Sequence, residues 1–361
     1  MWPDSRLTEL FGVEHPIVLA PMAGAMDVDL AVAVAEAGGL GSLPGAMLTA
    51  DALHRQVEDF RSRTGKPVNV NFFCHVAPVP NNAREAQWRE TLAPYYRELG
   101  IDPAAPLKSV NRAPFDEAFC VLVEDLKPAV VSFHFGLPEP ALLARVKAAG
   151  CRVISSATTV AEAVWLERRG ADAIVAQGAE AGGHRGMFLT DDIAGQAGTF
   201  ALVPQVVDAV EVPVIASGGI GDGRGIAAAF ALGAAGVQIG TAYLPCPESR
   251  ISAPYRTALA SARDDGTALT NVMSGRPARG IVNRLIREVG PVTPLAPQFP
   301  LAAAAVAPLR AKAEAAGSGD FSPMWAGQAA ALGRAVPARE TTERLVAQAQ
   351  AELRRLGRAA G

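Results

Sequence analysis

The feature of this sequence that most constrains the fold is a regular alternation of short apolar runs with helical stretches. Apolar runs begin at residues 130, 151 and 173, and again at 213 and 236, so neighbouring runs start 21 to 23 residues apart. This spacing is about the size of one compact strand and helix. Earlier runs at 16–20, 40–43 and 68–73 bring the number of candidate strands to eight. The pattern therefore predicts an α/β fold, a closed (β/α)8 TIM barrel rather than an open sheet.

Helical stretches separate most of these strands, and the first of them stops at a pair of glycines, a common signal for the end of a helix. The predicted helices cover residues 28–37, 50–63, 139–149, 160–169 and 200–210, with a further helix from Asp222 to about Leu232.

Two segments depart from the repeat. Residues 76–115 follow the third strand, contain six prolines and include a predicted helix near 84–99. An excursion of this length within a repeating fold is more often a lid or a pocket wall than a simple connection. After Leu244 the repeat ends. The predicted domains are thus a barrel over 1–244 with the excursion 76–115, and a helical C-terminal extension over 245–361 that packs on the barrel and closes the active site.

Within the extension, loops are expected at 273–280, which is basic, and at 322–328. A polar helix is expected at 339–356 with apolar residues along one side. That side either packs on the barrel exterior or forms the contact of a homodimer.

The charge balance argues against some classes of function. Lys and Arg number 33 and Asp and Glu 36, for a net charge of −3 without long runs of either sign, which disfavours nucleic acid or an acidic membrane as the partner. The four cysteines form no CxxC pair, and the histidines and carboxylates do not gather at strand ends, so we expect no metal. The apolar run 301–309 is too short to span a bilayer, and the first residues do not resemble a signal peptide. We therefore expect a cytoplasmic protein.

Glycine-rich turns follow the last two predicted strands, at 217–222 and 238–241. In a barrel these turns lie side by side at the catalytic face, where glycines expose backbone N–H groups and a helix begins, the usual arrangement for binding phosphate. The alternative is that both turns need glycine only for their geometry. The chain has neither a P-loop lysine motif nor a Rossmann GxGxxG, so the phosphate would belong to a cofactor or substrate at the barrel mouth.

The segment 176–186, AQGAEAGGHRG, follows a buried strand and places His184 among glycines at the catalytic rim. This makes His184 the candidate catalytic residue. Asn71 and Gln177, at strand ends, could bind the edge of a flat heterocycle or could belong to an internal polar layer. His75 and His134 are also at strand ends and could line a pocket. Arg185 could fix an anion or form a surface salt bridge.

Seven segments together resemble the nitronate monooxygenases, formerly called 2-nitropropane dioxygenases. They are APM (20–22), VNVNFF (68–73), SFHFG (132–136), AQGAEAGGHRG (176–186), ASGGIGD (216–222), VQIGT (237–241) and SGRPARG (274–280). The resemblance covers the whole barrel and enters the C-terminal part. The glycine and histidine motif is also similar to that of flavin-dependent enoyl-ACP reductases of the same fold.

The resemblance implies FMN as the cofactor. It places Met22, Asn71, Gln177 and Gly182 against the isoalloxazine and ribityl parts. Gly219, Gln238, Gly240 and Thr241 would hold the phosphate end, with Ile239 among the cofactor-binding residues. His184 matches the family's catalytic histidine, and His134 is assigned to the substrate pocket.

The implied reaction is the oxidation of alkyl nitronates, such as propionate 3-nitronate, and of nitroalkanes by O2 to carbonyl compounds and nitrite. Neutral His184 would remove the α-carbon proton of a nitroalkane, or donate to the oxygens of a nitronate. The alternatives are an NADH-dependent flavin enoyl-thioester reductase and a non-catalytic flavin- or phosphate-binding protein. The expected partners are the small substrate and O2, with no nucleic acid and no membrane.

Overall fold

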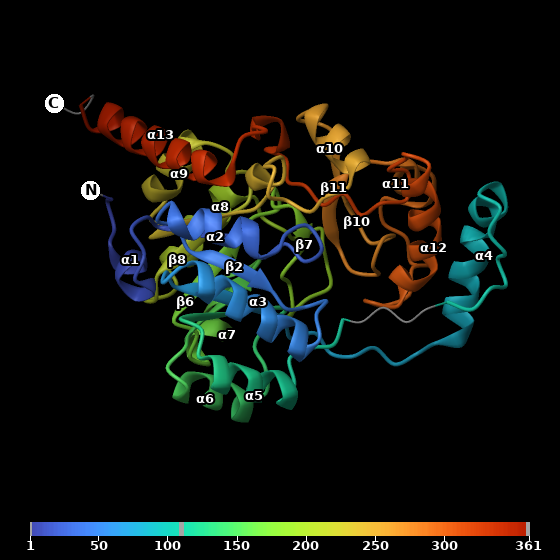
Figure 1. The fold of residues 1–361 in the computed structure, drawn as a ribbon, viewed down its shortest axis with the longest axis horizontal. Coiled ribbons are helices and arrows are strands. Elements are labelled where there is room, and N and C mark those ends of the chain that lie inside the picture. The colour runs from blue at the N-terminus through green and yellow to red at the C-terminus, as the bar shows by residue number, and fades with distance from the viewer. Residues whose placement is uncertain (1, 108–111, 359–361) are drawn as a thin grey trace.

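The computed structural model describes residues 2–107 and 112–358, and its centre is a barrel of eight parallel strands (Figure 1). Strand β1 pairs with β9 on one side, and a bridge between Val18 and Leu40 joins it to the β2 side. The (β/α)8 TIM barrel predicted from the sequence is confirmed, and every predicted strand lies within two residues of its bounds. The strands are β1 (Ile17–Leu19), β2 (Gly41–Pro44), β3 (Val68–Phe73), β4 (Val130–His134), β5 (Arg152–Ala157), β6 (Ala173–Gln177), β8 (Val214–Ser217) and β9 (Gly236–Ile239).

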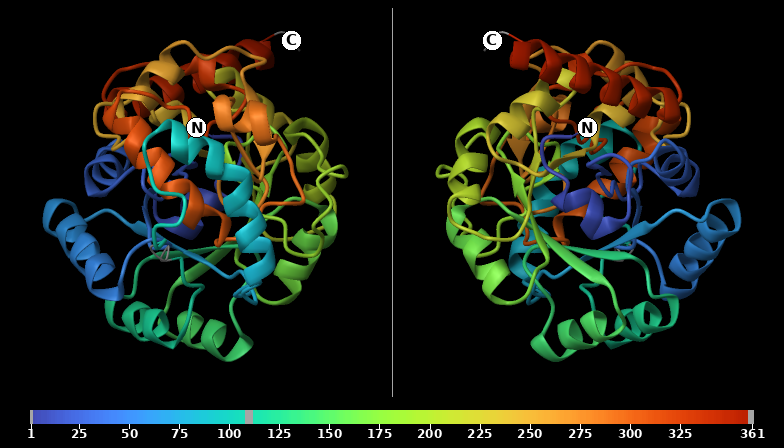
Figure 2. Two further views of the ribbon diagram at one scale, coloured as in Figure 1. Left: turned by 90° about the vertical axis from the view of Figure 1, so that its right-hand side faces the viewer. Right: turned by 90° about the vertical axis from the view of Figure 1, so that its left-hand side faces the viewer.

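Helices surround these strands, as the two side views of Figure 2 show. Side-chain caps fix several of their starts: Thr49, Thr159 and Asp222 each accept a hydrogen bond from the first turn. The helix predicted to reach residue 210 ends earlier, at Val207. The helices are α2 (Val28–Glu36), α3 (Ala50–Arg63), α5 (Glu117–Leu126), α6 (Pro140–Ala148), α7 (Val160–Arg168), α8 (Thr199–Val207) and α9 (Gly223–Ala231).

Helix α1 (Arg6–Phe11) packs at the other end of the barrel from the predicted site. Its buried Leu7 and Phe11 form a cluster with residues at the beginnings of strands, such as Val130 and Ala173. This cluster fills the amino-terminal end of the barrel, so the open end is the carboxyl end of the strands.

The excursion after β3 packs on the C-terminal part. Its helix α4 (Asn82–Glu98) lies against α12 (Ala302–Ala315), at the right of Figure 1 and in front of the barrel in the left view of Figure 2. Trp88 Nε1 donates to the carbonyl oxygen of Ala302 at 3.2 Å, and the Tyr96 hydroxyl to that of Ala305 at 2.6 Å. The two helices share a second hydrophobic cluster.

The last helix, α13 (Ala338–Arg358), packs on α9 and α2, so its apolar side contacts the barrel exterior. Helices α10 (Ala253–Ala260) and α11 (Arg284–Val289) and the short 3-10 helices Thr241–Tyr243 and Ala330–Leu332 complete the described helical elements. Residues 322–328 contain no helix or strand, as predicted. None of the helices in the described ranges is both long and apolar enough to cross a membrane.

A small antiparallel sheet joins the C-terminal part to the predicted site. It consists of β7 (Gly183–His184), β10 (Thr267–Thr270) and β11 (Ala278–Ile281). The prediction of a loop over 273–280 is therefore wrong for its last three residues. The four residues of β11 include arginine and glycine and carry no strand periodicity. Ala278 and Arg279 pair with His184 and Gly183 only because the fold brings these segments together.

Candidate active site

One cavity opens at the carboxyl ends of the barrel strands. Its walls include Asn71 on β3, His134 on β4, Gln177 on β6, Ser217 on β8 and Gln238 on β9. Enzymes with this barrel carry their active sites at this end, because the loops that follow the strands converge there.

His75, which could line a pocket by its position in the sequence, does not line this cavity, whereas all the residues assigned to catalysis, the substrate pocket or the cofactor do. The assigned residues are His184, His134, Met22, Asn71, Gln177, Gly182, Gly219, Gln238, Ile239, Gly240 and Thr241. The structure thus brings the whole assigned set together, while the role of each residue stays a prediction.

The two glycine turns form one end of the cavity. Gly218 and Gly219 have φ angles of 112° and 71°, which favour glycine. Gly240 is crowded: an added Cβ would lie 3.1 Å from Ala20 Cβ and 3.2 Å from Met22 Sδ. The turns therefore need glycine for their geometry.

The same turns also carry spare hydrogen-bond donors. Within the described part of the chain, the amides of Gly219, Ile220, Gly240 and Thr241 donate to no acceptor, and all four residues line the cavity. Unpaired backbone N–H groups at the end of a cavity suit an anionic oxygen ligand. The residues present therefore fit a group that ends in a phosphate.

His184 lies on β7, where pairing with β11 fixes its backbone. Its Nε2 is 2.8 Å from Ser274 Oγ, and its ring centroid is 5.2 Å from that of Phe299 and 5.4 Å from that of Trp325. Burial, and next the charge of Arg112, hold the pKa of His184 well below its usual value of 6.5. The imidazole is therefore neutral at neutral pH and can accept a proton.

Two predicted residues hold the backbone of His184 in place. Its carbonyl oxygen accepts from Gln177 Nε2 at 3.0 Å and from His134 Nε2 at 3.1 Å. Gln177 Oε1 accepts from the Gly186 amide at 2.7 Å, so both ends of this side chain are used. His134 Nδ1 lies 3.0 Å from Ser156 Oγ, and burial lowers the pKa of His134 to about 3. His134 is thus neutral and directed at the peptide of His184.

Asn71 is also bonded within the barrel. Its Nδ2 donates to Ser132 Oγ at 3.0 Å and to the Ser132 carbonyl oxygen at 3.2 Å. Asn71 and Gln177 therefore belong to an internal polar layer, and they line the cavity at the same time.

Both sequence-based suggestions for Arg185 are wrong. Its side chain is fully buried, and its guanidinium donates to the carbonyl oxygens of Gln177 and Gly178 at 2.6 and 2.5 Å. Its Nε donates to Gln196 Oε1 at 2.9 Å. The guanidinium thus holds the loop through hydrogen bonds to these three acceptors, so Arg185 neither fixes an anion nor forms a surface salt bridge.

The sequence did not single out several groups near His184. Arg112 lines the cavity from the proline-rich excursion, and Trp325 from the loop 322–328. Ser274 and Arg276 appeared only within the motif SGRPARG. No periodicity marks these positions, because each comes from a loop. Among the described residues, no group of three or more His, Cys, Asp or Glu side chains could hold a metal.

Comparisons with known proteins agree with this geometry. The sequence model of the family described as nitronate monooxygenase matches residues 4–348. A protein of Pseudomonas aeruginosa named nitronate monooxygenase is 44% identical over 343 residues, covering 94% of this chain and 98% of its own. One of Paraburkholderia phytofirmans with the same name is 44% identical over 350 residues, covering 96% and 94%.

Solved structures show similar folds. A nitroalkane oxidase from Streptomyces ansochromogenes superimposes with a TM-score of 0.87 at 39% identity, over 98% of this chain and 99% of its own. FabK from Thermotoga maritima gives a TM-score of 0.76 at 29% identity, over 99% of each chain.

Proposed function

Because the chain belongs to the nitronate monooxygenase family, we propose that it oxidises alkyl nitronates, such as propionate 3-nitronate, and nitroalkanes. The chain is an oxidoreductase of a flavin-dependent family. In the proposed reaction, O2 is the oxidant, and the products are a carbonyl compound and nitrite. The observation that carries the proposal is one cavity that joins a neutral, half-buried histidine to the glycine turns, whose amides donate to no acceptor in the described part of the chain.

We propose FMN as the flavin. The amides of Gly219, Ile220, Gly240 and Thr241 would hold its phosphate, and Met22, Asn71, Gln177 and Gly182, along the same cavity, would contact the rest of it. When bound, FMN supplies the acceptor of the substrate's electrons and the group that reacts with O2.

His184 handles the proton. Its Nδ1 hydrogen-bonds to no described residue, whereas Nε2 is engaged with Ser274, so Nδ1 is the ring nitrogen left to accept the α-carbon proton of a nitroalkane. The aromatic rings of Phe299 and Trp325 beside it exclude water. A nitronate has already lost this proton and needs positive charge or hydrogen-bond donors at its oxygens instead.

The runner-up function is an NADH-dependent flavin enoyl-thioester reductase. The likeness to FabK favours it. However, FabK is 29% identical to this chain, whereas the two proteins named nitronate monooxygenase are 44% identical, so we rank the reductase second.

One experiment separates these functions. The cofactor of the purified protein is released and identified by mass spectrometry, and flavin bleaching is then followed anaerobically by stopped flow with propionate 3-nitronate and with NADH. We expect FMN, fast bleaching by the nitronate, and slow or no bleaching by NADH. Fast bleaching by NADH alone would establish the reductase, and a protein that takes up no flavin would end the proposal.

Location and assembly complete the proposal. The four cysteines are free thiols, which supports the cytoplasm, a reducing compartment. We also propose a homodimer, which light scattering on the purified protein will test against a monomer.

A further inference from the structure

Arg112 has an unused guanidinium at the cavity. It lines the same cavity as His184, and its guanidinium donates no hydrogen bond to a described residue. Its Nε is buried and has no partner within residues 2–107 and 112–358. No carboxylate of the described residues lies within 4.0 Å of its nitrogens, since none of the salt bridges includes Arg112. A half-buried cation without a counter-charge is costly unless a ligand supplies the anion.

The surroundings of Arg112 add further positive charge. Arg310 lines the cavity too. Burial is the main cause that lowers the pKa of Arg112, and the nearby charge of Arg310 is the second. Glu314 neutralises Arg310, with Nε and Oε1 2.9 Å apart, and also accepts from Ser322 Oγ at 2.7 Å. Arg276 stacks over the ring of Phe135, its Cζ 4.1 Å from the ring centroid, and its charge adds to burial in lowering the pKa of His184. This end of the cavity therefore holds more positive than negative charge.

Arg112 and His184 flank the same aromatic ring. Arg112 Cζ is 5.7 Å from the centroid of Phe299, and the imidazole centroid of His184 is 5.2 Å from it. Both residues line one cavity, and burial and the charge of Arg112 both lower the pKa of His184, so the two side chains are close enough to act on one ligand.

We propose that Arg112 binds an oxyanion of the substrate and thereby makes the enzyme prefer anionic over neutral nitro compounds. The inference rests on the proposed function for its substrate. The planar guanidinium presents paired N–H donors that match two oxygens of one group. Those oxygens belong either to the nitronate itself or to a carboxylate elsewhere on the molecule.

The test compares three substrates in wild type and Arg112→Met: nitroethane, ethyl nitronate and propionate 3-nitronate. Hydrogen bonds to charged groups predict a loss of about tenfold to a hundredfold in kcat/KM for the anions, and a smaller loss for nitroethane, whose oxygens gain charge only as its proton leaves. A loss for both nitronates assigns the nitronate oxygens, and a loss for propionate 3-nitronate alone assigns the carboxylate. Arg112→Lys should recover part of the activity. An unchanged preference, or equal losses on all three substrates, would overturn the proposal.

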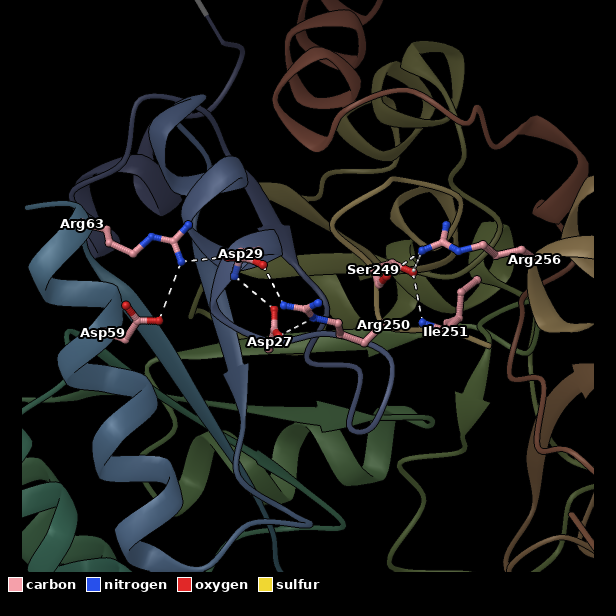
Figure 3. A network of polar contacts seen from close by, with 8 residues as sticks. All are labelled: Asp27, Asp29, Asp59, Arg63, Ser249, Arg250, Ile251 and Arg256. Atoms are coloured by element: carbon pink, nitrogen blue, oxygen red, sulfur yellow. Dashed lines mark hydrogen bonds and ion pairs between the residues drawn. The ribbon is translucent and has the colours of Figure 1, made fainter. Parts of the chain in front are cut away.

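Arg250 offers a matched control. It also lines the cavity, but two carboxylates neutralise it: Nε pairs with Asp27, and the second bond joins Nη2 to Asp29 Oδ2 at 2.8 Å (Figure 3). Arg250→Met removes the same charge from the same cavity, and we expect it to keep the ratio of kcat/KM for nitronate to that for nitroethane.

A binding measurement separates this inference from the proposed function. Inorganic nitrate is a planar oxyanion that does not react, and calorimetry should show that wild type binds it and Arg112→Met binds it at least about tenfold more weakly. If wild type binds nitrate through Arg112 but oxidises no nitro compound, the proposed function fails and the anion site stands. If wild type oxidises nitronates and nitrate binding is equal in both proteins, the anion site fails.

Discussion

Burial decides the protonation of the histidines around the cavity. Desolvation is the largest cause of the lowered pKa of His184, His134 and His75, and for His75 the value falls to about 4. Positive neighbours such as Arg112 and Arg276 act in the same direction. A neutral imidazole can accept a proton from a nitroalkane, and the positive charge of the arginines suits an anionic nitronate. The two forms of a nitro compound would therefore depend on different residues.

His184→Asn should separate these two forms. Asparagine keeps a donor toward the oxygens of a nitronate but cannot accept the α-carbon proton, so we expect activity on nitroalkanes to fall by about 100-fold or more and activity on nitronates to fall less. The measurement is kcat/KM on nitroethane and ethyl nitronate, with bound flavin as a check of folding. Equal losses on the two substrates would remove the role of His184 as a base.

The buried histidines also predict how stability depends on pH. Their folded pKa lies below the unfolded value of 6.5, so the unfolded state binds protons first, and stability is full above about pH 7 and falls as the pH drops from 6.5 toward 4 or 3. Between pH 7.5 and 5.5, His75 and His134 should each cost about 1 kcal/mol of the free energy of unfolding. Urea unfolding at both pH values measures this cost. In His75→Phe the free energy of unfolding should decline by about 1 kcal/mol less than in wild type. An equal decline in both proteins would contradict a lowered pKa of His75.

Single residues show where reading the sequence succeeds. Gln177 ends β6, His184 comes shortly after it, and Gly240 follows β9, so the barrel pattern alone places them at one rim. Arg185 and Arg112 could not be assigned this way, because their roles depend on which acceptors the fold brings near. Arg185 meets three oxygens, and Arg112 meets none among the residues that the structure describes.

At the scale of elements, α7 anchors the loop that follows His184. Glu162, in the first turn of α7, is fully buried, and its carboxylate accepts from the amides of Thr158, Phe188 and Leu189 at 2.7, 2.6 and 3.2 Å, and from Thr158 Oγ1 at 2.8 Å. One helix thus fixes both the chain at the end of β5 and the chain that follows His184.

Glu162→Ala should destabilise the protein by about 3 to 5 kcal/mol, because it leaves several buried amides without an acceptor. The loss should also loosen the segment 186–189, which hydrogen exchange would detect. Glu167 on the same helix is the control: it accepts from the amides of Glu211 and Val212, far along the chain from His184. Glu167→Ala should cost about 1 kcal/mol and leave exchange at 186–189 unchanged. The same exchange pattern in both variants would contradict the anchor.

Elements differ in how well their sequence predicts them. The eight barrel strands are mostly apolar because parallel strands are buried on both faces, and this makes them recognisable. Strand β7 has two residues, Gly183 and His184, and β11 contains Arg279 and Gly280. Their pairing depends on contacts between distant parts of the chain, so no local pattern predicts it.

At the scale of the whole molecule, the hydrophobic interior is divided. One cluster joins the barrel strands to the surrounding helices, and a separate cluster joins α4 of the excursion to α12 and the residues around Leu285 and Phe321. A bidentate pair between Arg284 and Glu98, at 2.6 and 2.8 Å, adds to this second unit. The excursion and the C-terminal part therefore stabilise each other beside the barrel, and Arg112 lies on the return from this unit to β4.

This division predicts a local response to a change at Trp88, which is 1% exposed and bonded to Ala302. Trp88→Ala removes a large buried ring, so it should cost about 3 to 5 kcal/mol in the second cluster. Because the barrel strands contribute to a different cluster, hydrogen exchange should accelerate in α4 and α12 and stay slow in β4, β5 and β6. Trp88→Phe keeps most of the ring and loses only the hydrogen bond, so its effect should be near 1 kcal/mol. Equal acceleration in α12 and in the barrel strands would mean that the two clusters unfold as one. In that case a loss of kcat/KM on anionic substrates in Trp88→Ala would reflect the lower stability of the whole protein and not a displacement of Arg112.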